Sequence, residues 1–222
     1  MPSKLEKFAD VDAFPNCFVL FYVDLDKGLA IKGNWLKDYF KNDNPIVVEL
    51  GCGKGEYTVG LAKKYPNINY IGVDVKGNRL WTGAKEALDL KLNNVAFLRT
   101  RVDFIEKCFA ENEISEIWIT FPDPQPQKTR ARKRLTHMLF LNRYKKLLKP
   151  GGIVQLKTDS TFLYEYTLEV IKENNFPLLF NTNDLYKNCP KGREELIEIK
   201  THYEKLFTDK GEDIKYCSFN IN

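Results

Sequence analysis

The sequence of 222 residues has little histidine and no clustered cysteine. Its two histidines, His137 and His202, argue against chemistry built on several histidines. The cysteines are odd in number, scattered and without a C-x-x-C pair: Cys17, Cys52, Cys108, Cys189 and Cys217. This pattern argues against a disulfide framework or a zinc site, and it favours a reducing cytoplasm. We therefore expect a protein without a bound metal.

A long apolar run is also missing. No stretch approaches the roughly 18 residues that a membrane helix needs, so we expect no membrane partner. The segment MPSKLEKFADVDAFPN has early acids and no apolar centre, which is not typical of a secretory signal. A composition of 43% hydrophobic and 29% charged residues, over this length, is that of one sizeable globular domain. We expect a cytoplasmic protein that is a monomer or a homodimer.

Acidic residues are absent between Asp123 and Asp159, and we call this window the basic sector. The window contains ten of the 34 Lys and Arg residues, which leaves 24 cations against 30 acids elsewhere. The net charge of +4 therefore combines a basic window with a remainder of net charge −6. Localised positive charge is typical of a surface that binds a polyanion. A Lys-rich helix face exposed to solvent would give the same count.

Short apolar runs alternate with helical patterns from residue 46 onward. The runs lie at residues 46–50, 70–74, 95–100, 116–121 and 153–158, and the helical patterns at 56–65, 76–92, 104–110, 135–148 and 161–173. This alternation predicts an α/β fold with a mostly parallel sheet and helices on both faces. A candidate strand at residues 214–221 would lie near the sheet edge. We expect an arm at residues 1–44, in which residues 18–23 form a short strand or cover the substrate, and one domain at residues 45–222.

The first strand is followed by a glycine-rich turn, with Gly51, Gly53 and Gly55 after Glu49. Strand, glycines and helix are the usual order of a nucleotide-binding turn, because glycine allows positive φ and close approach of a ligand. The third glycine comes one residue too early for G-x-G-x-x-G. A carboxylate at Glu49 suits a ligand with a cationic end, such as S-adenosylmethionine, better than a pyrophosphate. Asp74 ends the second strand, where an acid can accept both ribose hydroxyls; a βα turn without a ligand is the alternative.

The next two strand ends supply further candidates. The third strand ends in Thr100-Arg101-Val102-Asp103, and either Arg101 or Asp103 stands where an acid often meets adenine in methyltransferases. The fourth ends in Pro122-Asp123-Pro124, and proline restricts both its own φ and the residue before it. The carboxylate of Asp123 is therefore pre-oriented at the sheet edge where α/β proteins bind ligands. A plain strand-ending turn would have the same sequence.

Together these motifs resemble the bacterial tRNA (guanine-N7)-methyltransferases over residues 46–204. The family pattern E-[IL]-G-x-G-x-G-E corresponds to residues 49–56, Y-I-G-[IV]-[ED] to residues 70–74, and K-T-D to residues 157–159. F-x-D-P-W-P-K-x-R-x-x-K-R-R-L corresponds, altered, to residues 121–135, and T-x-[YF]-E to residues 201–204. The departures are Gln125 in place of Trp and Gln127 in place of Lys. Lys128 can replace that lysine by a shift of one residue.

The resemblance implies a Rossmann-like class I methyltransferase fold with an antiparallel strand near the C-terminus. It also implies transfer of a methyl group from S-adenosylmethionine to N7 of a guanine in the variable loop of tRNA. By position, the cofactor would be bound by Glu49, Gly51, Gly53, Gly55, Asp74, Asp103 and Asp123, with Asp123 as the catalytic residue. The guanosine would be bound by Gln127, Lys128, Asp159, Thr201, His202, Tyr203 and Glu204. The tRNA backbone would be bound by Arg130, Arg132, Lys133 and Arg134.

This chemistry fits a chain with few histidines. Guanine N7 has a free lone pair at neutral pH, so the enzyme chiefly aligns the reactants and excludes water. Asp159 or Glu204 could accept the guanine N1–H and amino group, although Asp159 could equally cap the helix that starts at residue 161. Two other functions stay open: methylation of an amino group on another RNA base, and RNA binding by a catalytically inactive relative.

Overall fold

The apolar runs of the sequence form the strands of one sheet in the computed structural model, which describes residues 2–222. The strands are β1 (Cys17–Val19), β2 (Ile46–Leu50), β3 (Asn69–Asp74), β4 (Val95–Arg99), β5 (Ile114–Thr120), β6 (Leu148–Thr158), β7 (Leu178–Thr182) and β8 (Lys215–Asn220). The helices are α1 (Lys4–Ala13), α2 (Glu56–Lys64), α3 (Gly77–Asp89), α4 (Met138–Leu147), α5 (Thr161–Glu173), α6 (Glu195–Glu198) and α7 (His202–Thr208). Short helical turns are η1 (Tyr22–Asp24), η2 (Trp35–Phe40), η3 (Val102–Lys107) and η4 (Lys128–Lys133).

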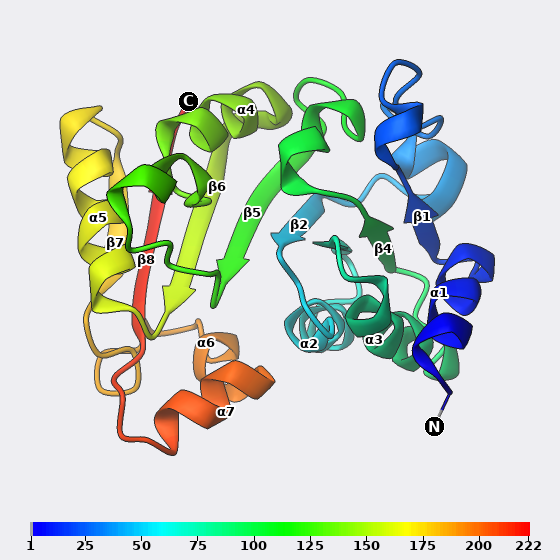
Figure 1. Cartoon of the computed structure of the whole chain (residues 1–222). Helices are drawn as coiled ribbons and strands as arrows, with labels where there is room; N and C mark the ends of the chain where they lie inside the picture. Colours follow the sequence, from blue (N-terminus) through cyan, green and yellow to red (C-terminus); the bar gives the residue numbers. More distant parts are fainter. Residues whose placement is uncertain (1) are drawn as a thin grey trace.

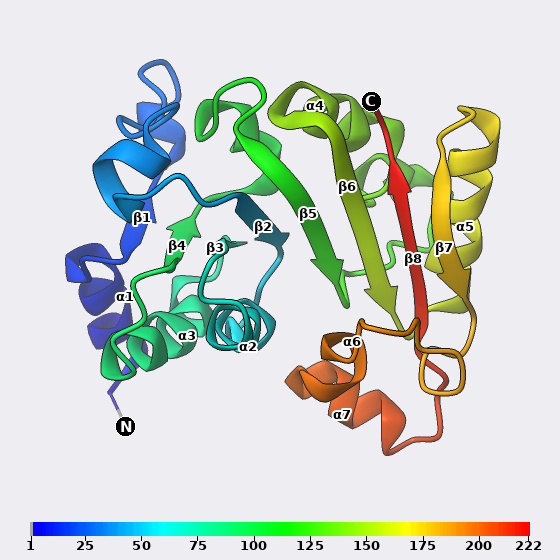
Figure 2. The same ribbon diagram turned by 180° about the vertical axis from the view of Figure 1, so that it is seen from behind.

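The strand order is β1-β4-β3-β2-β5-β6-β8-β7 (Figures 1 and 2). From β1 to β6 every pairing is parallel, and β8 is antiparallel to both β6 and β7. The expected parallel sheet and the antiparallel strand near the C-terminus are therefore confirmed. The carboxyl ends of β2 to β6 meet at one edge of the sheet, which is where ligands bind in open α/β folds.

The two faces of the sheet carry separate apolar cores. Neighbouring residues of β2 point to opposite sides, as alternation in a strand requires. Val48 packs in one core with Leu163 of α5, and Val47 packs in the other with Tyr57 of α2 and Leu80 of α3. Every residue of β2 is buried, which explains why its sequence is a continuous apolar run broken only by Glu49.

Several elements differ from the sequence-based expectation. The helix expected at residues 104–110 is the 3₁₀ turn η3. The short strand expected within residues 18–23 is present as β1, although it covers only residues 17–19 and is followed by η1. The strand β7 and the helices α1, α6 and α7 were not anticipated. For α1 a signal was present: Ser3 Oγ accepts a hydrogen bond from the Glu6 N–H at 3.2 Å, and the Glu6 carboxylate accepts one from the Ser3 N–H at 2.6 Å. This is a capping box, readable as Ser-x-x-Glu.

Within residues 2–222, every helix is too short or too polar to cross a membrane.

Candidate active site

Five carboxylates lie at the carboxyl edge of the sheet, one for each of five adjacent strands. In the spatial order of the strands they are Asp103 after β4, Asp74 at the end of β3, Glu49 in β2, Asp123 after β5 and Asp159 after β6. Parallel pairing brings these strand ends side by side, although the residues span 110 positions of sequence. The structure thus gathers all the acids that the sequence analysis singled out at strand ends.

The glycine-rich turn closes tightly against the neighbouring strands. Gly53 and Gly55 have φ of +58° and +75°, a region that favours glycine. A Cβ at Gly55 would lie 2.6 Å from Cε1 of Phe97, whereas one at Gly53 would meet nothing within 4 Å. The backbone at Gly53 is therefore open to a ligand. Its N–H donates to Asp74 Oδ2 at 2.9 Å, and the Lys76 N–H donates to Oδ1 at 2.7 Å, so the Asp74 carboxylate is already oriented at this turn.

Glu49 lies inside the sheet edge and is only 3% exposed. Its carboxylate accepts hydrogen bonds from the Thr58 N–H at 2.9 Å, from the Thr58 hydroxyl, and from the Thr120 hydroxyl at 2.5 Å. Burial raises the pKa of this carboxyl from 4.5 to about 7, although the threonine hydrogen bonds oppose that shift. Glu49 therefore joins β2, α2 and β5 at the centre of the edge. Neither threonine was anticipated, because hydrogen bonds between side chains of different elements leave no local sequence pattern.

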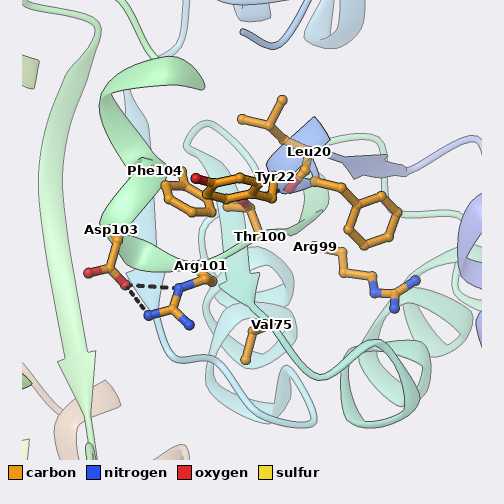
Figure 3. A pocket seen from close by; sticks show the side chains of 9 residues that line it. Leu20, Tyr22, Val75, Arg99, Thr100, Arg101, Asp103 and Phe104 are labelled. Carbon is orange, nitrogen blue, oxygen red and sulfur yellow. Dashed lines mark hydrogen bonds and ion pairs between the residues drawn. The ribbon is translucent and has the colours of Figure 1, made fainter. Parts of the chain in front are cut away.

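A pocket of about 550 Å³ opens beside the ends of β3 and β4 (Figure 3). Its apolar walls include Val75, Tyr22 and Phe104, and the two aromatic rings have centroids 6.2 Å apart. Asp103 and Arg101 lie at one side of it and form an ion pair at 3.1 Å. Flat apolar walls with a carboxylate at one side suit a heteroaromatic ring that carries an amino group. The residues present therefore fit the adenosine part of S-adenosylmethionine.

The loop that carries Asp123 has an unusual backbone. Phe121 and Gln125 have φ of +47° and +45°, values that residues other than glycine seldom adopt. The Phe121 N–H donates to the Lys157 carbonyl at 2.8 Å, and the Gln125 N–H donates to Asp123 Oδ1 at 3.1 Å. Asp123 itself is exposed. Backbone conformations of this kind persist where surrounding contacts impose them, and they concentrate at functional sites.

The basic sector separates into cations with internal partners and cations that face solvent. Lys157 is fully buried, Arg143 and Lys146 pair with Glu106 at 3.6 and 2.9 Å, and Arg134 is 5% exposed. Within residues 2–222 the other six have no carboxylate within ion-pair distance: Lys128, Arg130, Arg132, Lys133, Lys145 and Lys149. Four of these lie together on η4 and are exposed. The burial of Arg134 differs from the expectation that it contacts the tRNA backbone.

The segment expected to bind guanosine begins α7, which lies beside the tips of β5 and β6 (Figures 1 and 2). Thr201 caps this helix, because its hydroxyl accepts from the Glu204 N–H at 3.1 Å. The His202 N–H donates to Glu56 Oε2 at 2.9 Å, which ties α7 to the start of α2. The side chains of His202 and Tyr203 are exposed. Glu56 was not singled out, since only the fold brings it to α7.

Glu204 is fully buried, which differs from the expectation that it accepts hydrogen bonds from guanine. Its carboxylate forms an ion pair with Lys157 at 2.8 Å and accepts from the Tyr186 hydroxyl at 2.8 Å. Burial lowers the pKa of Lys157, and the nearby Glu204 opposes that change. A side chain without exposed surface cannot reach a base unless the helix moves. The first residue of the motif at residues 157–159 and the last residue of the motif at residues 201–204 thus form one internal contact.

Asp159 is the expected guanine contact that remains open to a ligand. The cap of α5 is Ser160, whose hydroxyl accepts from the Leu163 N–H at 3.2 Å, so Asp159 does not have that role. Partial burial raises the pKa of the Asp159 carboxyl, and Lys215 opposes this. An aromatic row joins α7 to the residue that follows β5: the ring centroid of Phe207 is 6.4 Å from that of Phe121 and 6.5 Å from that of Tyr203. Phe207 was not anticipated, because it falls outside the motif that ends at Glu204.

Comparison with known proteins gives the class first. A family model described as "Putative methyltransferase" matches residues 43–217. A 16S rRNA methyltransferase, KamB, has a similar fold, with a TM-score of 0.62 at 14% identity over 84% of this chain and 92% of that one. An antibiotic-related methyltransferase has a TM-score of 0.59 at 17% identity, over 83% and 90% of the two chains. With the strand order, these findings define a methyltransferase with the class I fold.

Sequence relatives give the family. The tRNA (guanine-N(7)-)-methyltransferase of Bacteroides fragilis is 51% identical over 98% of this chain and 85% of its own length. Its counterpart in Christiangramia forsetii is 49% identical over 99% of this chain and 98% of its own length. The chain therefore belongs to the family of tRNA (guanine-N7)-methyltransferases.

Proposed function

We propose that this protein transfers the methyl group of S-adenosylmethionine to N7 of a guanine in the variable loop of tRNA. The observation that carries this proposal is the position of Asp123. Its carboxylate lies on a constrained loop between the acid-lined cofactor edge and the exposed cations of η4. Family membership supplies the substrate, and the residues around Asp123 supply a place where cofactor and base can meet.

We assign the acids at the sheet edge to different parts of the cofactor. We assign Asp103 and the pocket beside it to adenine, and Asp74 to the ribose hydroxyls. Glu49, Gly51, Gly53, Gly55 and Asp123 are assigned to the amino acid end and the sulfonium. When bound, S-adenosylmethionine supplies a methyl group that is already activated by its sulfonium. The protein's part is to hold the acceptor in line with that methyl group and to exclude water.

The guanine needs an acceptor for its N1–H and amino group, and we assign this role to Asp159. An adenine would leave that carboxylate facing another acceptor, at a cost on the order of 1–3 kcal/mol. Gln127, Lys128, His202 and Tyr203 would surround the base. Thr201 and Glu204 contribute through the helix that they stabilise. Recognition of RNA bases commonly uses aromatic stacking, and the row formed by Tyr203, Phe207 and Phe121 offers such a surface.

The tRNA backbone would lie along η4, on Arg130, Arg132 and Lys133. Exposed cations without internal partners can exchange their counterions for phosphates, which makes binding dependent on salt. The N-terminal arm, residues 1–44, would cover the adenine end of the cofactor through Phe21 and Tyr22, which line the pocket. We further propose that the protein acts in the cytoplasm, as a monomer or a homodimer.

The direct test is incubation with labelled S-adenosylmethionine and unmodified tRNA, followed by identification of the product nucleoside. N7-methylguanosine is expected. A methylated amino group would indicate a different RNA methyltransferase, and no product with tRNA still bound would indicate a catalytically inactive relative.

Asp123→Ala tests the central residue. We expect it to abolish methyl transfer while tRNA binding persists, because the loop contributes its carboxylate to the cofactor and not to the RNA. Asp43→Ala is a matched control, since Asp43 is an exposed aspartate in the turn before β2, at the opposite end of that strand. Near-normal turnover in Asp123→Ala would remove Asp123 from the mechanism.

A further inference from the structure

Arg134 is the buried member of a run of cations that otherwise face solvent. It directly follows η4, and its side chain lies against α5. The guanidinium carbon is 4.7 Å from the ring centroid of Phe162 and 4.3 Å from that of Tyr166. These two aromatic residues are four positions apart on α5 and so share one face of the helix. Two rings thus hold the guanidinium, where it is shielded from solvent.

The polar contacts of Arg134 go to the loop that contains Asp123. Its Nε donates to the Gln125 carbonyl at 3.1 Å, and its Nη2 lies 3.5 Å from the Pro126 carbonyl. The Gln125 N–H in turn donates to Asp123 Oδ1 at 3.1 Å. The backbone of one residue, Gln125, therefore links the buried guanidinium to the carboxylate, through its carbonyl on one side and its N–H on the other. This link uses the backbone of Gln125, so it does not depend on which side chain stands at that position.

The prolines of this loop restrict its φ angles, but they give it few backbone hydrogen bonds. Pro122, Pro124 and Pro126 have no backbone N–H to donate. Gln125 sits at positive φ, a conformation that reverts unless neighbouring contacts impose it. A planar guanidinium can stack on rings and donate to carbonyls at the same time, whereas the ammonium of lysine offers no plane for stacking.

We infer that Arg134 is a positioning residue for methyl transfer, which acts by holding Gln125 and so orienting the Asp123 carboxylate, and that it does not bind a tRNA phosphate. This inference rests on the proposed function in assigning Asp123 to the reaction. The neighbouring cations therefore have two different roles. Arg130, Arg132 and Lys133 bind RNA, whereas Arg134 holds the loop that carries Asp123 against α5.

The test compares Arg134→Lys, Arg134→Met and Arg132→Met, in the full-length protein. For each we would measure kcat at saturating tRNA, the Kd for S-adenosylmethionine by calorimetry, and the slope of log Kd for tRNA against log salt. Both Arg134 variants should lose kcat by about 10- to 100-fold, since small misplacements of a reacting group have effects of this size. Their salt slopes should equal that of wild type. Arg132→Met should reduce the slope by about 0.7–0.9, as loss of one phosphate contact does.

The opposite pattern would overturn the inference. If Arg134→Lys keeps kcat and Arg134→Met reduces the salt slope as Arg132→Met does, Arg134 binds a phosphate. If the Arg134 variants do not fold, Phe162→Leu tests the same inference, because Phe162 is 41% exposed and its ring can be replaced without opening the core. It should lower kcat several-fold at an unchanged slope, and a wild-type kcat would refute the bracing role. If wild type transfers no methyl group, the proposed function fails, but the slopes measured on RNA binding still decide whether Arg134 contacts phosphate.

Discussion

Removing the charge of Glu204 should lower the free energy of unfolding, because this carboxylate neutralises the buried ammonium of Lys157. Lys157 and Glu204 both have 0% exposed side chains and lie 2.8 Å apart. Glu204→Gln keeps the size of the side chain and leaves the Lys157 charge without its counterion. Breaking a buried pair from one side costs about 3–5 kcal/mol. Lys157→Met should cost a similar amount, since it leaves the Glu204 carboxylate buried alone.

The double variant Lys157→Met/Glu204→Leu provides the decisive comparison. It contains no uncompensated charge. It loses the donor to the carbonyls of Leu196 and Ile199, which Lys157 now contacts, and the acceptor of the Tyr186 hydroxyl. Unsatisfied buried acceptors cost about 1–3 kcal/mol. We therefore expect the double variant to be more stable than either single variant. For a chain of this length, each kcal/mol corresponds to a change of about 2–4 °C in Tm.

Urea unfolding followed by circular dichroism would give the free energies of the four proteins, and the KM for tRNA would be measured in parallel. Additive losses in the double variant would show that the two residues do not act as a pair. If Glu204→Gln lies within about 1 kcal/mol of wild type and only its KM rises, Glu204 contacts guanosine and the structural role is refuted.

Two further predictions concern the carboxyl edge of the sheet and the helix α7 beside it. Burial raises the Glu49 pKa to about 7, so between pH 4.5 and 7 the folded state binds more protons than the unfolded state. The free energy of unfolding should therefore fall by about 3 kcal/mol as the pH rises through this window. Urea unfolding of Glu49→Gln should show no such decline, and an unchanged decline in this variant would contradict the prediction. Glu56→Ala removes the acceptor of the His202 N–H and should raise the KM for tRNA about 2- to 12-fold. Glu56→Gln should have a KM close to that of wild type, because its amide oxygen can accept the same hydrogen bond. A wild-type KM in Glu56→Ala would show that the hydrogen bond between Glu56 and His202 has no effect on tRNA binding.

The strands and the strand-end acids could be predicted because their causes are local. A strand buried on both faces must be apolar throughout, so the run at residues 46–50 identified β2 to the residue. Parallel pairing then places the residues that follow such strands at one edge, which is how Asp74 and Asp123 could be assigned to one site without knowledge of the strand order. By contrast, β7 has exposed leucines at residues 178 and 179 and no regular alternation, so no pattern indicated a strand.

The roles of Arg134 and Glu204 could not be read from the sequence, because their partners are distant in it. In the sequence Arg134 is one of several neighbouring cations, and only its contact with Phe162 and Tyr166 of α5 distinguishes it from them. Glu204 looks like a ligand in a motif, and only its contact with Lys157, 47 positions earlier, shows otherwise. In both cases a charged residue at a motif position serves the framework around the site. The replacement of the family's Trp by Gln125 is compatible with this, since the contacts of that residue with Arg134 and Asp123 use its backbone.

The pairing of β1 with β4 has a consequence for how the pocket comes into being. Val19 lies opposite Arg99, about 80 residues later in the chain, and the residues that follow both strands line the pocket. No contiguous piece of the polypeptide can form this cavity. On the ribosome, residues 17–19 remain without a partner until β4 has emerged, because a parallel strand cannot pair with a neighbour that has not been made. The pocket is thus assembled only after nearly half of the chain has been synthesised.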